Sequence, residues 1–588
     1  MSILELTTSL IEETTSRSIP FFSAELCLSA TIVLLLLFRV TGIDRWLSPV
    51  LTAVVGSCAA LIFVILQYTG AGEGSVFGPP PAATDPDRFF FTGLMVQDYF
   101  SIFFRAFLAG FLMLTVALTS LTGIPDEEDG PDFYCLLIGG TIGMMIMAGA
   151  NNLLMLFIGV EMASVPSYAM VGFLKGRKPS SEAALKYVIY GAGAAGVMLY
   201  GISLLAGTLG TGDFSLIAER LSVAADQQPL TLSVPAVRTI VLGTLLVLVG
   251  LAFKLSLVPF HFWCPDAFEG APAEVAGFLS VASKAGAFAL LVRFCLALTG
   301  TPGQPVPLME SIGIGIGVIA CISTTFGNLA AYAQNNLKRL LAYSTIAHAG
   351  YMVMAVAAMM VLASGESVML EGQSADAGDA ATRAISGLLY YLVVYLFMNL
   401  GAFAVVAMVR NYTYSEDISG VKGLVSQSPV LCVTMLICFF SLVGLPPFGG
   451  FFAKLQIFLS LMNAGQLHWF MYVVLAFGAI NTLFSLFYYL RVLKAMFIEE
   501  RPADARPVSI RFASWDGVFV STLALFVLLL GVFPSVMNNL SGTASEAARS
   551  AIPGQAEPSL AATAATAATN VNPSGLEYPN PTGPGIDD

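Results

Sequence analysis

Long apolar runs recur along the whole chain, and they restrict its possible folds more than any other feature. Each run holds about 20 residues, the number that an α-helix needs to cross the hydrocarbon core of a bilayer, and ends at charged residues or Gly/Pro clusters. The sequence therefore predicts an all-α polytopic membrane protein with about 14 transmembrane helices. The runs lie near 21–41, 47–68, 95–121, 133–149, 151–174, 182–208, 238–260, 271–299, 311–333, 340–363, 384–410, 427–464, 468–496 and 513–537.

The composition agrees with a membrane protein and excludes several functional classes. Hydrophobic residues make up 56% of the 588 residues and charged residues only 11%, whereas about 25% of a soluble domain is charged. The net charge of −12 resides largely in short loops and in the tails, so it does not indicate a nucleic-acid partner. The eight cysteines are scattered and form no CxxC pair, which argues against a disulfide framework or an iron–sulfur site.

The distribution of Lys and Arg predicts how the chain is oriented. Counted over alternate loops, fourteen basic residues fall on one side of the membrane and six on the other. Because basic loops favour the cytoplasm, both termini are expected on the non-cytoplasmic side. The first twenty residues hold three glutamates and one arginine, the wrong polarity for a signal peptide, so the first apolar run is expected to be a retained helix.

Lys254 is the most informative of the charged residues that fall inside the runs. It precedes Pro259 by five residues in GLAFKLSLVPFHFWCPD. Proline removes a backbone donor and kinks a helix, which leaves carbonyls that water or polar side chains must satisfy. The alternative is a lysine whose amine extends to the membrane interface. We favour a hydrated pocket because Lys284 and Lys454 repeat the situation in other runs.

Burying these three lysines is costly, which points to a function. A charged lysine at the bilayer centre costs about 2.5–3.5 kcal/mol on insertion scales. Burial also favours the neutral amine, and a carboxylate about 8 Å away would restore roughly 2 kcal/mol of the charged form at an effective dielectric of 20. Glu161, five residues before Pro166, is a candidate for that carboxylate. Such an acid and several amines in one bundle are what a proton relay requires, although Glu161 could instead pair with a neighbouring base.

The remaining ionisable residues divide between relay and structure. Lys186 is equally consistent with the relay and with a helical i,i+4 pair to Glu182, and His348 is a candidate relay residue because imidazole titrates near neutrality. His261 and His468 lie near run ends and are expected at the interface. Arg105 and Arg293 stay charged at accessible pH, so we expect structural ion pairs for both.

Four segments together resemble a known family. FKLSLVPFHFWCPDAFEGAP (253–272), SVASKAGAF (280–288), NNLKRLLAYSTIAHAGYM (335–352) and GVEMASVPSYAMVGF are similar to subunit N of bacterial NADH:quinone oxidoreductase, respiratory complex I, in the antiporter-like family of membrane subunits. The resemblance covers about 95 to 500. It implies a proton relay of Glu161, Lys254, Lys284 and Lys454, with Lys186 and His348 as lesser members.

The resemblance also implies an organisation into two inverted repeats with broken helices. A short match between Ser256–Phe260 and the segment 441–448 is consistent with such a duplication. We expect N-terminal helices in 1–132, of which about three span the membrane. A first repeat is expected in 133–300 and a second in 301–500. A final transmembrane helix in 501–542 and a disordered tail in 543–588 follow. The segment 364–383 and the tail are longer than the family needs.

The expected function is proton translocation as part of a larger enzyme in the bacterial cytoplasmic (inner) membrane. No cofactor or metal is expected in this chain; NADH, FMN, iron–sulfur clusters and quinone are implied in partner subunits. The expected partners are the neighbouring antiporter-like and small membrane-arm subunits and the lipid bilayer. Two alternatives are an Mrp-type Na⁺/H⁺ antiporter subunit and an inert scaffold between neighbouring pumps.

Overall fold

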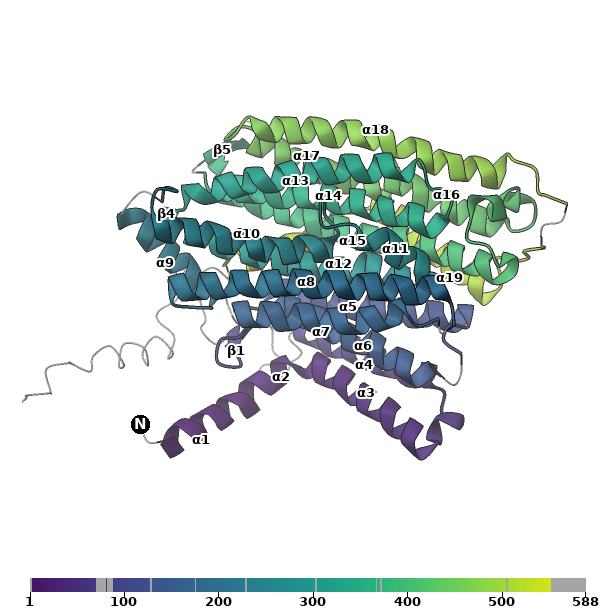
Figure 1. The fold of residues 1–588 in the computed structure, drawn as a ribbon, viewed down its shortest axis with the longest axis horizontal. Helices are drawn as coiled ribbons and strands as arrows, with labels where there is room; N and C mark the ends of the chain where they lie inside the picture. The colour runs from purple at the N-terminus through teal and green to yellow at the C-terminus, as the bar shows by residue number, and fades with distance from the viewer. Residues whose placement is uncertain are drawn as a thin grey trace, which may run out of the picture.

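The protein is a bundle of long, nearly parallel helices (Figure 1). The computed structural model describes residues 3–69, 81, 88–126, 129–174, 176–227, 230–301, 304–365, 367–370, 373–503 and 506–550. Within these residues, 13 helices are long and apolar enough to cross a membrane. The fourteenth expected span is divided into two short helices, α16 and α17. The expected all-helical membrane fold is therefore confirmed.

The N-terminal part supplies three of the spans. The α1 helix leads away from the bundle and meets α3 at an angle, so that the two diverge on one side of the molecule (Figure 1). The elements of this part are α1 Ile3–Glu13, a π-helical turn Thr14–Ser18, α2 Ile19–Phe21, α3 Ser23–Thr41, α4 Pro49–Thr69, the hairpin of β1 Phe89–Phe90 and β2 Met95–Val96, and α5 Tyr99–Thr122.

The next segment contains a helix that is broken between Leu255 and Trp263. Its elements are α6 Gly130–Gly149, α7 Leu153–Val171, α8 Lys178–Leu209, α9 Phe214–Gln227, α10 Pro235–Leu255, α11 Trp263–Gly270 and α12 Ala273–Leu298. Ser256 ends α10 with a left-handed φ of 59°, and its backbone amide bonds back to the helix. The break therefore falls just before Pro259, as the sequence predicts.

The following segment has a second break, at Gly444–Phe448. Its elements are β3 Gly300–Thr301, β4 Gln304–Pro305, α13 Pro307–Ala331, α14 Leu337–Ala363, β5 Ser367–Leu370, β6 Gln373–Asp376, α15 Ala377–Thr413, two 3₁₀ turns at Ile418–Val421 and Leu424–Ser426, α16 Pro429–Val443, α17 Gly449–Ala464 and α18 Phe470–Phe497. Gly444 has a φ of 90°, a conformation that suits glycine. The 427–464 run is therefore divided into two helices at this point.

An identical backbone connection occurs once in each of these two segments. Asn152, at the start of α7, forms a bridge with Asp213, which follows α8. Asn336, at the start of α14, forms the corresponding bridge with Asp417, which follows α15. Both asparagines cap their helices and both stand in an Asn-Asn-Leu sequence. Successive long helices cross the bundle in alternating directions, which places the two bridges at opposite ends of it. Two inverted repeats require this arrangement.

The C-terminal part differs from the expectation at its end. After α19, Trp515–Val532, a further helix α20 spans Pro534–Ser550 and packs against α15 and α5. Arg549 forms ion pairs with Asp376 and Asp379, so α20 is attached to the segment 364–383 that the sequence left without a role. The chain is thus helical eight residues beyond the expected start of the tail at 543. The rest of that tail, 551–588, lies outside the described residues.

Three helices form the centre of the bundle. In their most apolar windows, every residue of α12 is buried, as are 94% of α14 and 89% of α15. In contrast, only 28% is buried in each of α3, α4, α8 and α18. Side chains on α12, α14 and α15 are therefore shielded from lipid, and polar groups there need partners within the protein or bound water.

Candidate functional site

Lys254 lies at the end of α10, directly before the first break. Its side chain is 1% exposed, and Nζ donates a hydrogen bond of 3.0 Å to Ser164 Oγ on α7. The lysine is therefore buried between helices and does not extend to the membrane interface. The expected buried position is confirmed, whereas its part in a relay stays a prediction.

Glu161 lies one turn before Ser164 on the same helix. Its charge interacts with that of Lys254, although these two described side chains form no direct ion pair. Pro166 stands inside α7, and the hydroxyl of Ser167 donates back to the carbonyl of Ala163, which supports the backbone near the proline. The structure thus brings Glu161 and Lys254 to neighbouring positions across α7 and α10.

Lys284 donates a hydrogen bond to a carbonyl that the first break leaves without a helical partner. It lies on α12, is 1% exposed, and donates from Nζ to the carbonyl oxygen of Leu255 over 2.6 Å. Leu255 is the last residue of α10. No backbone N–H of a following helical turn is therefore present to donate to its carbonyl. Because Lys254 precedes Leu255 in sequence, the two lysines are connected through the end of one helix.

Lys454 makes the equivalent contact at the second break. It lies on α17, is 4% exposed, and donates to the carbonyl oxygens of Leu442 and Val443 over 3.0 and 2.9 Å. Its Nζ also lies 4.4 Å from the centre of the Tyr351 ring, a favourable position for a cation. A lysine therefore binds the freed carbonyls at each of the two broken helices.

His348 lies on α14, within electrostatic range of Lys454 and Lys284. Its ring is 1% exposed. The Nδ1 atom lies 2.7 Å from the hydroxyl of Tyr391, and Nε2 lies 3.4 Å from that of Tyr489. Both ring nitrogens thus face groups that can donate and accept protons.

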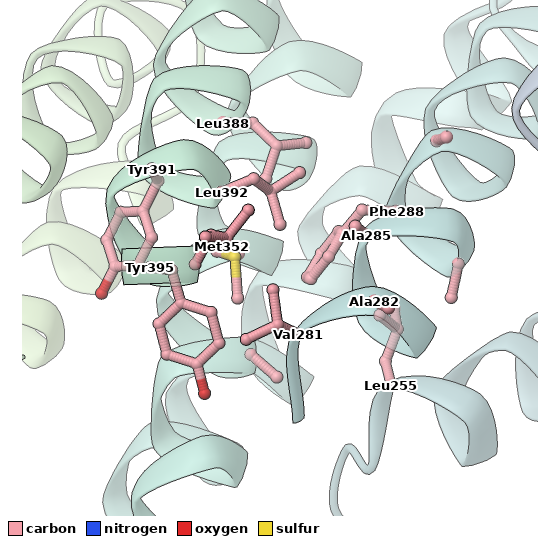
Figure 2. Close-up of a cluster of buried hydrophobic side chains, with 14 of the residues drawn as sticks. Leu255, Val281, Ala282, Ala285, Phe288, Met352, Leu388, Tyr391, Leu392 and Tyr395 are labelled. Atoms are coloured by element: carbon pink, nitrogen blue, oxygen red, sulfur yellow. The ribbon is translucent and has the colours of Figure 1, made fainter. Parts of the chain in front are cut away.

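An apolar cluster lies where α12, α14 and α15 pack together, next to the tyrosines near His348. Figure 2 shows Val281 and Ala285 of α12 facing Met352 of α14, with Leu392 of α15 and the rings of Tyr391 and Tyr395 beyond them. Methyl and thioether groups cannot carry a proton. A proton could cross this cluster only with water beside these side chains.

Lys186 lies apart from the three buried lysines and His348, on the outer face of the bundle. Its side chain is 42% exposed and pairs with Glu182 at 2.8 Å and with Asp266 at 2.9 Å. Asp266 also accepts a hydrogen bond from Arg339. The i,i+4 pair predicted from the sequence is present, and a second carboxylate joins it.

Arg105 and Arg293 are both buried and form structural pairs, as expected. Arg105 pairs with Glu25 over 2.6 Å, and Arg293 pairs with Asp98 over 2.8 Å. His261 differs from its expectation at the interface: it is 3% exposed because its ring packs against Phe326 of α13, although the neighbouring Phe262 is exposed. Position near the end of a run does not reveal such packing.

Sequence reasoning missed two buried charged residues next to α12. Glu274, in the first turn of that helix, is fully buried. Lys338, which the sequence places in a basic loop, is 2% exposed and pairs with Glu416 over 2.9 Å. The missed signal was the glutamate of GAPAEVAGFL, which is flanked by apolar and small residues. In the part of the chain that the structure describes, no three His, Cys, Asp or Glu side chains gather as a metal site would require.

Comparison with known proteins places this arrangement in a family. The family model described as NADH:quinone oxidoreductase/Mrp antiporter, TM, matches residues 150–372 and 376–484. The NADH-quinone oxidoreductase subunit N of Anaeromyxobacter sp. (strain Fw109-5) is 37% identical over 88% of this chain and 94% of its own length. Subunit N 2 of Chloroherpeton thalassium is 33% identical over 87% of this chain and 91% of its own.

Solved structures show the same fold. A chain of respiratory complex I from Thermus thermophilus with bound aureothin has a TM-score of 0.66 at 27% identity, covering 88% of this chain and 99% of that one. A chain of the Mrp complex from Dietzia sp. DQ12-45-1b has a TM-score of 0.66 at 18% identity, covering 92% of this chain and 98% of that one; at this identity the likeness concerns the fold alone. The chain belongs to the antiporter-like family of membrane subunits, on the branch of NADH-quinone oxidoreductase subunit N.

Proposed function

We propose that this subunit moves protons across the membrane through a row of ionisable groups that consists of the partly buried Glu161 and the buried Lys254, Lys284, His348 and Lys454. The observation that carries the proposal is the repeated contact at the two broken helices. Lys284 and Lys454 each bind carbonyls that a break leaves free, and His348 interacts with both lysines. Lys186, in an exposed ion-pair cluster, contributes only at the edge of this row.

Proton movement along the row is driven by electrostatic interaction between neighbouring ionisable groups. Electron transfer takes place in partner subunits of the NADH:quinone oxidoreductase, and a change of charge at one end of the row alters the interaction of Glu161 with Lys254. A buried amine whose counter-charge weakens releases its proton more readily. The proton then passes toward Lys284 and, when water enters beside the apolar cluster, toward His348 and Lys454.

The orientation follows from the basic residues. The face with the ends of α11 and α15 and the starts of α12 and α14 carries Lys338, Arg339 and Arg410. We assign this basic face to the cytoplasm of a bacterial cell. Both termini then lie on the other side of the inner membrane, and the neighbouring membrane-arm subunits pack against the outer helices.

Replacing Lys254 or Glu161 tests the proposal. In the assembled complex, Lys254→Gln and Glu161→Gln should each reduce NADH-driven proton uptake into inverted vesicles sharply. Pumping at the normal ratio of protons to electrons with either variant would refute the relay. An inert scaffold predicts that assembly, turnover and pumping all survive.

The Mrp-type antiporter is the second candidate, because the matching family description includes it. Sodium flux across proteoliposomes distinguishes the two. Co-purification with redox subunits and inhibition by a quinone-site inhibitor support the oxidoreductase. Sodium-dependent proton flux from a preparation without redox subunits supports the antiporter.

A further inference from the structure

Glu274 is an acid that the relay described above does not use. It is the second residue of α12 and is 0% exposed, and neither carboxylate oxygen has a hydrogen-bond partner among the described residues. Among the described residues, the two other buried acids, Glu25 and Asp98, each pair with an arginine. A buried carboxyl without a partner is costly and indicates a functional group or bound water.

A chain of charged groups leads from the basic face to Glu274. Glu416 is the most accessible member, with a side chain 18% exposed, and pairs with Lys338. Lys338 donates from Nζ to the carbonyl of Ala271 over 2.6 Å, three residues before Glu274, and its charge interacts with that of Glu274. Glu416 is the ion-pair partner of Lys338, and Glu274 forms no ion pair with it among the described residues.

Other charged groups at this end of α12 are themselves paired. Arg410 contacts Glu416 over 3.3 Å. Arg339 of α14 bonds to two acids of α11, and Asp132 at the start of α6 pairs with Arg39 in the last turn of α3. The charged groups that the elements packed against α12 carry here are Asp132, Asp266, Glu269, Lys338, Arg339, Arg410 and Glu416.

Buried polar groups continue from Glu274 along α12. Asn399 of α15 donates to Ser280 over 2.5 Å, while Asn399 Oδ1 and the Ser283 hydroxyl have no partner among the described residues. The rise of a helix places Ser280 about 9 Å and Lys284 about 15 Å beyond Glu274. These separations exceed one hydrogen bond, so water must bridge them, and the unpartnered oxygens are suitable ligands for it.

We propose that Glu274 is the proton-uptake group on the basic face: it takes a proton that enters past Glu416 and Lys338 and passes it, by way of Ser280 and Asn399, to Lys284. The O–H bond of the acid breaks as an N–H bond forms on the neutral amine. The carboxylate left behind lies near the Lys338 ammonium and regains a proton from water at the basic face. This inference rests on the proposed role of Lys284.

The test measures proton pumping by the assembled complex in vesicles as the pH on the basic side is varied from 6 to 8. With Glu274→Gln, uptake must come directly from bulk water. We expect pumping to fall at least tenfold at pH 7, and the remainder to fall roughly tenfold for each further pH unit. Glu274→Asp should restore part of the rate. The matched control is Glu499→Gln, an acid in a surface pair with Lys422, which should pump normally.

Four outcomes would overturn the inference. A loss with Glu274→Gln that is the same at every pH would indicate a structural role. Normal pumping with Glu274→Gln while Lys284→Arg abolishes pumping would refute this inference and leave the relay standing, whereas normal pumping in both would refute both. If Glu274→Gln does not assemble, Ser280→Ala takes its place: several-fold slower pumping with the same alkaline loss supports the route, and an unchanged rate refutes it.

Discussion

Replacing Lys454 by arginine and by methionine separates its structural contacts from its ability to carry a proton. Arginine keeps a positive charge and donors for the carbonyls of Leu442 and Val443, and it can stack on Tyr351. Methionine removes all three contacts. Two buried carbonyls without partners cost about 1–3 kcal/mol each, so Lys454→Met should destabilise the subunit by about 2–6 kcal/mol.

The arginine variant should assemble but not pump. A guanidinium has a pKa above about 12, so releasing its proton at pH 7 costs roughly five pKa units, or about 7 kcal/mol. Such a barrier slows transfer by about 10⁵-fold. The assay is the quench of a pH-sensitive dye in inverted vesicles during NADH oxidation, with assembly checked by native gel electrophoresis. Normal pumping by Lys454→Arg would show that the amine at this position does not transfer protons.

Three further changes test other parts of the structure. Glu161→Gln removes a charge that interacts with Lys254, so we expect a roughly tenfold loss of proton pumping at normal assembly; an unchanged proton-to-electron ratio would exclude the acid from the relay. Gly450→Ala places a Cβ 1.8 Å from the carbonyl oxygen of Ser441, so the backbone at the second break must shift. Thermal denaturation of the complex should show a loss of stability larger than the roughly 1–3 kcal/mol typical of overpacking. A melting temperature equal to that of the native complex would contradict this. Arg549 holds the pKa of Asp376 below its usual range by a hydrogen-bonded ion pair. This exposed pair stabilises the attachment of α20 by at most about 1 kcal/mol above pH 4, and the stabilisation is lost as the pH falls through the lowered pKa. Arg549→Gln should therefore increase proteolysis of α20 at pH 7 and make no difference near pH 2, whereas equal cleavage of the variant and the native protein at pH 7 would argue against the attachment.

Local chemistry explains why the main features could be predicted from the sequence. The apolar runs specify the spans because bilayer thickness sets their length. Pro259 specifies the first break because proline cannot donate within a helix, and the break supplies the carbonyl that Lys284 binds. The Gly/Pro cluster at 444–450 acts in the same way for Lys454.

Features that depend on tertiary packing could not be predicted. Lys338 reads as a loop residue, but α14 begins at Leu337 and places it beneath Glu416. His261 stands near the end of a run, yet its ring is buried against Phe326. The burial of Glu274 depends on the helices that surround α12, which no local pattern records. The Asn-Asn-Leu repeat was visible in the sequence, but its meaning depends on the two backbone bridges.

Water between Lys284 and His348 tests the central claim most directly. A high-resolution cryo-EM structure of the complete complex during turnover would resolve bound water around the α12, α14 and α15 helices. We predict that at least one resolved state contains a continuous line of water from the Lys284 amine past Val281 and Met352 to the imidazole of His348. Tight apolar packing in this region in every state, while the complex pumps protons, would contradict the account.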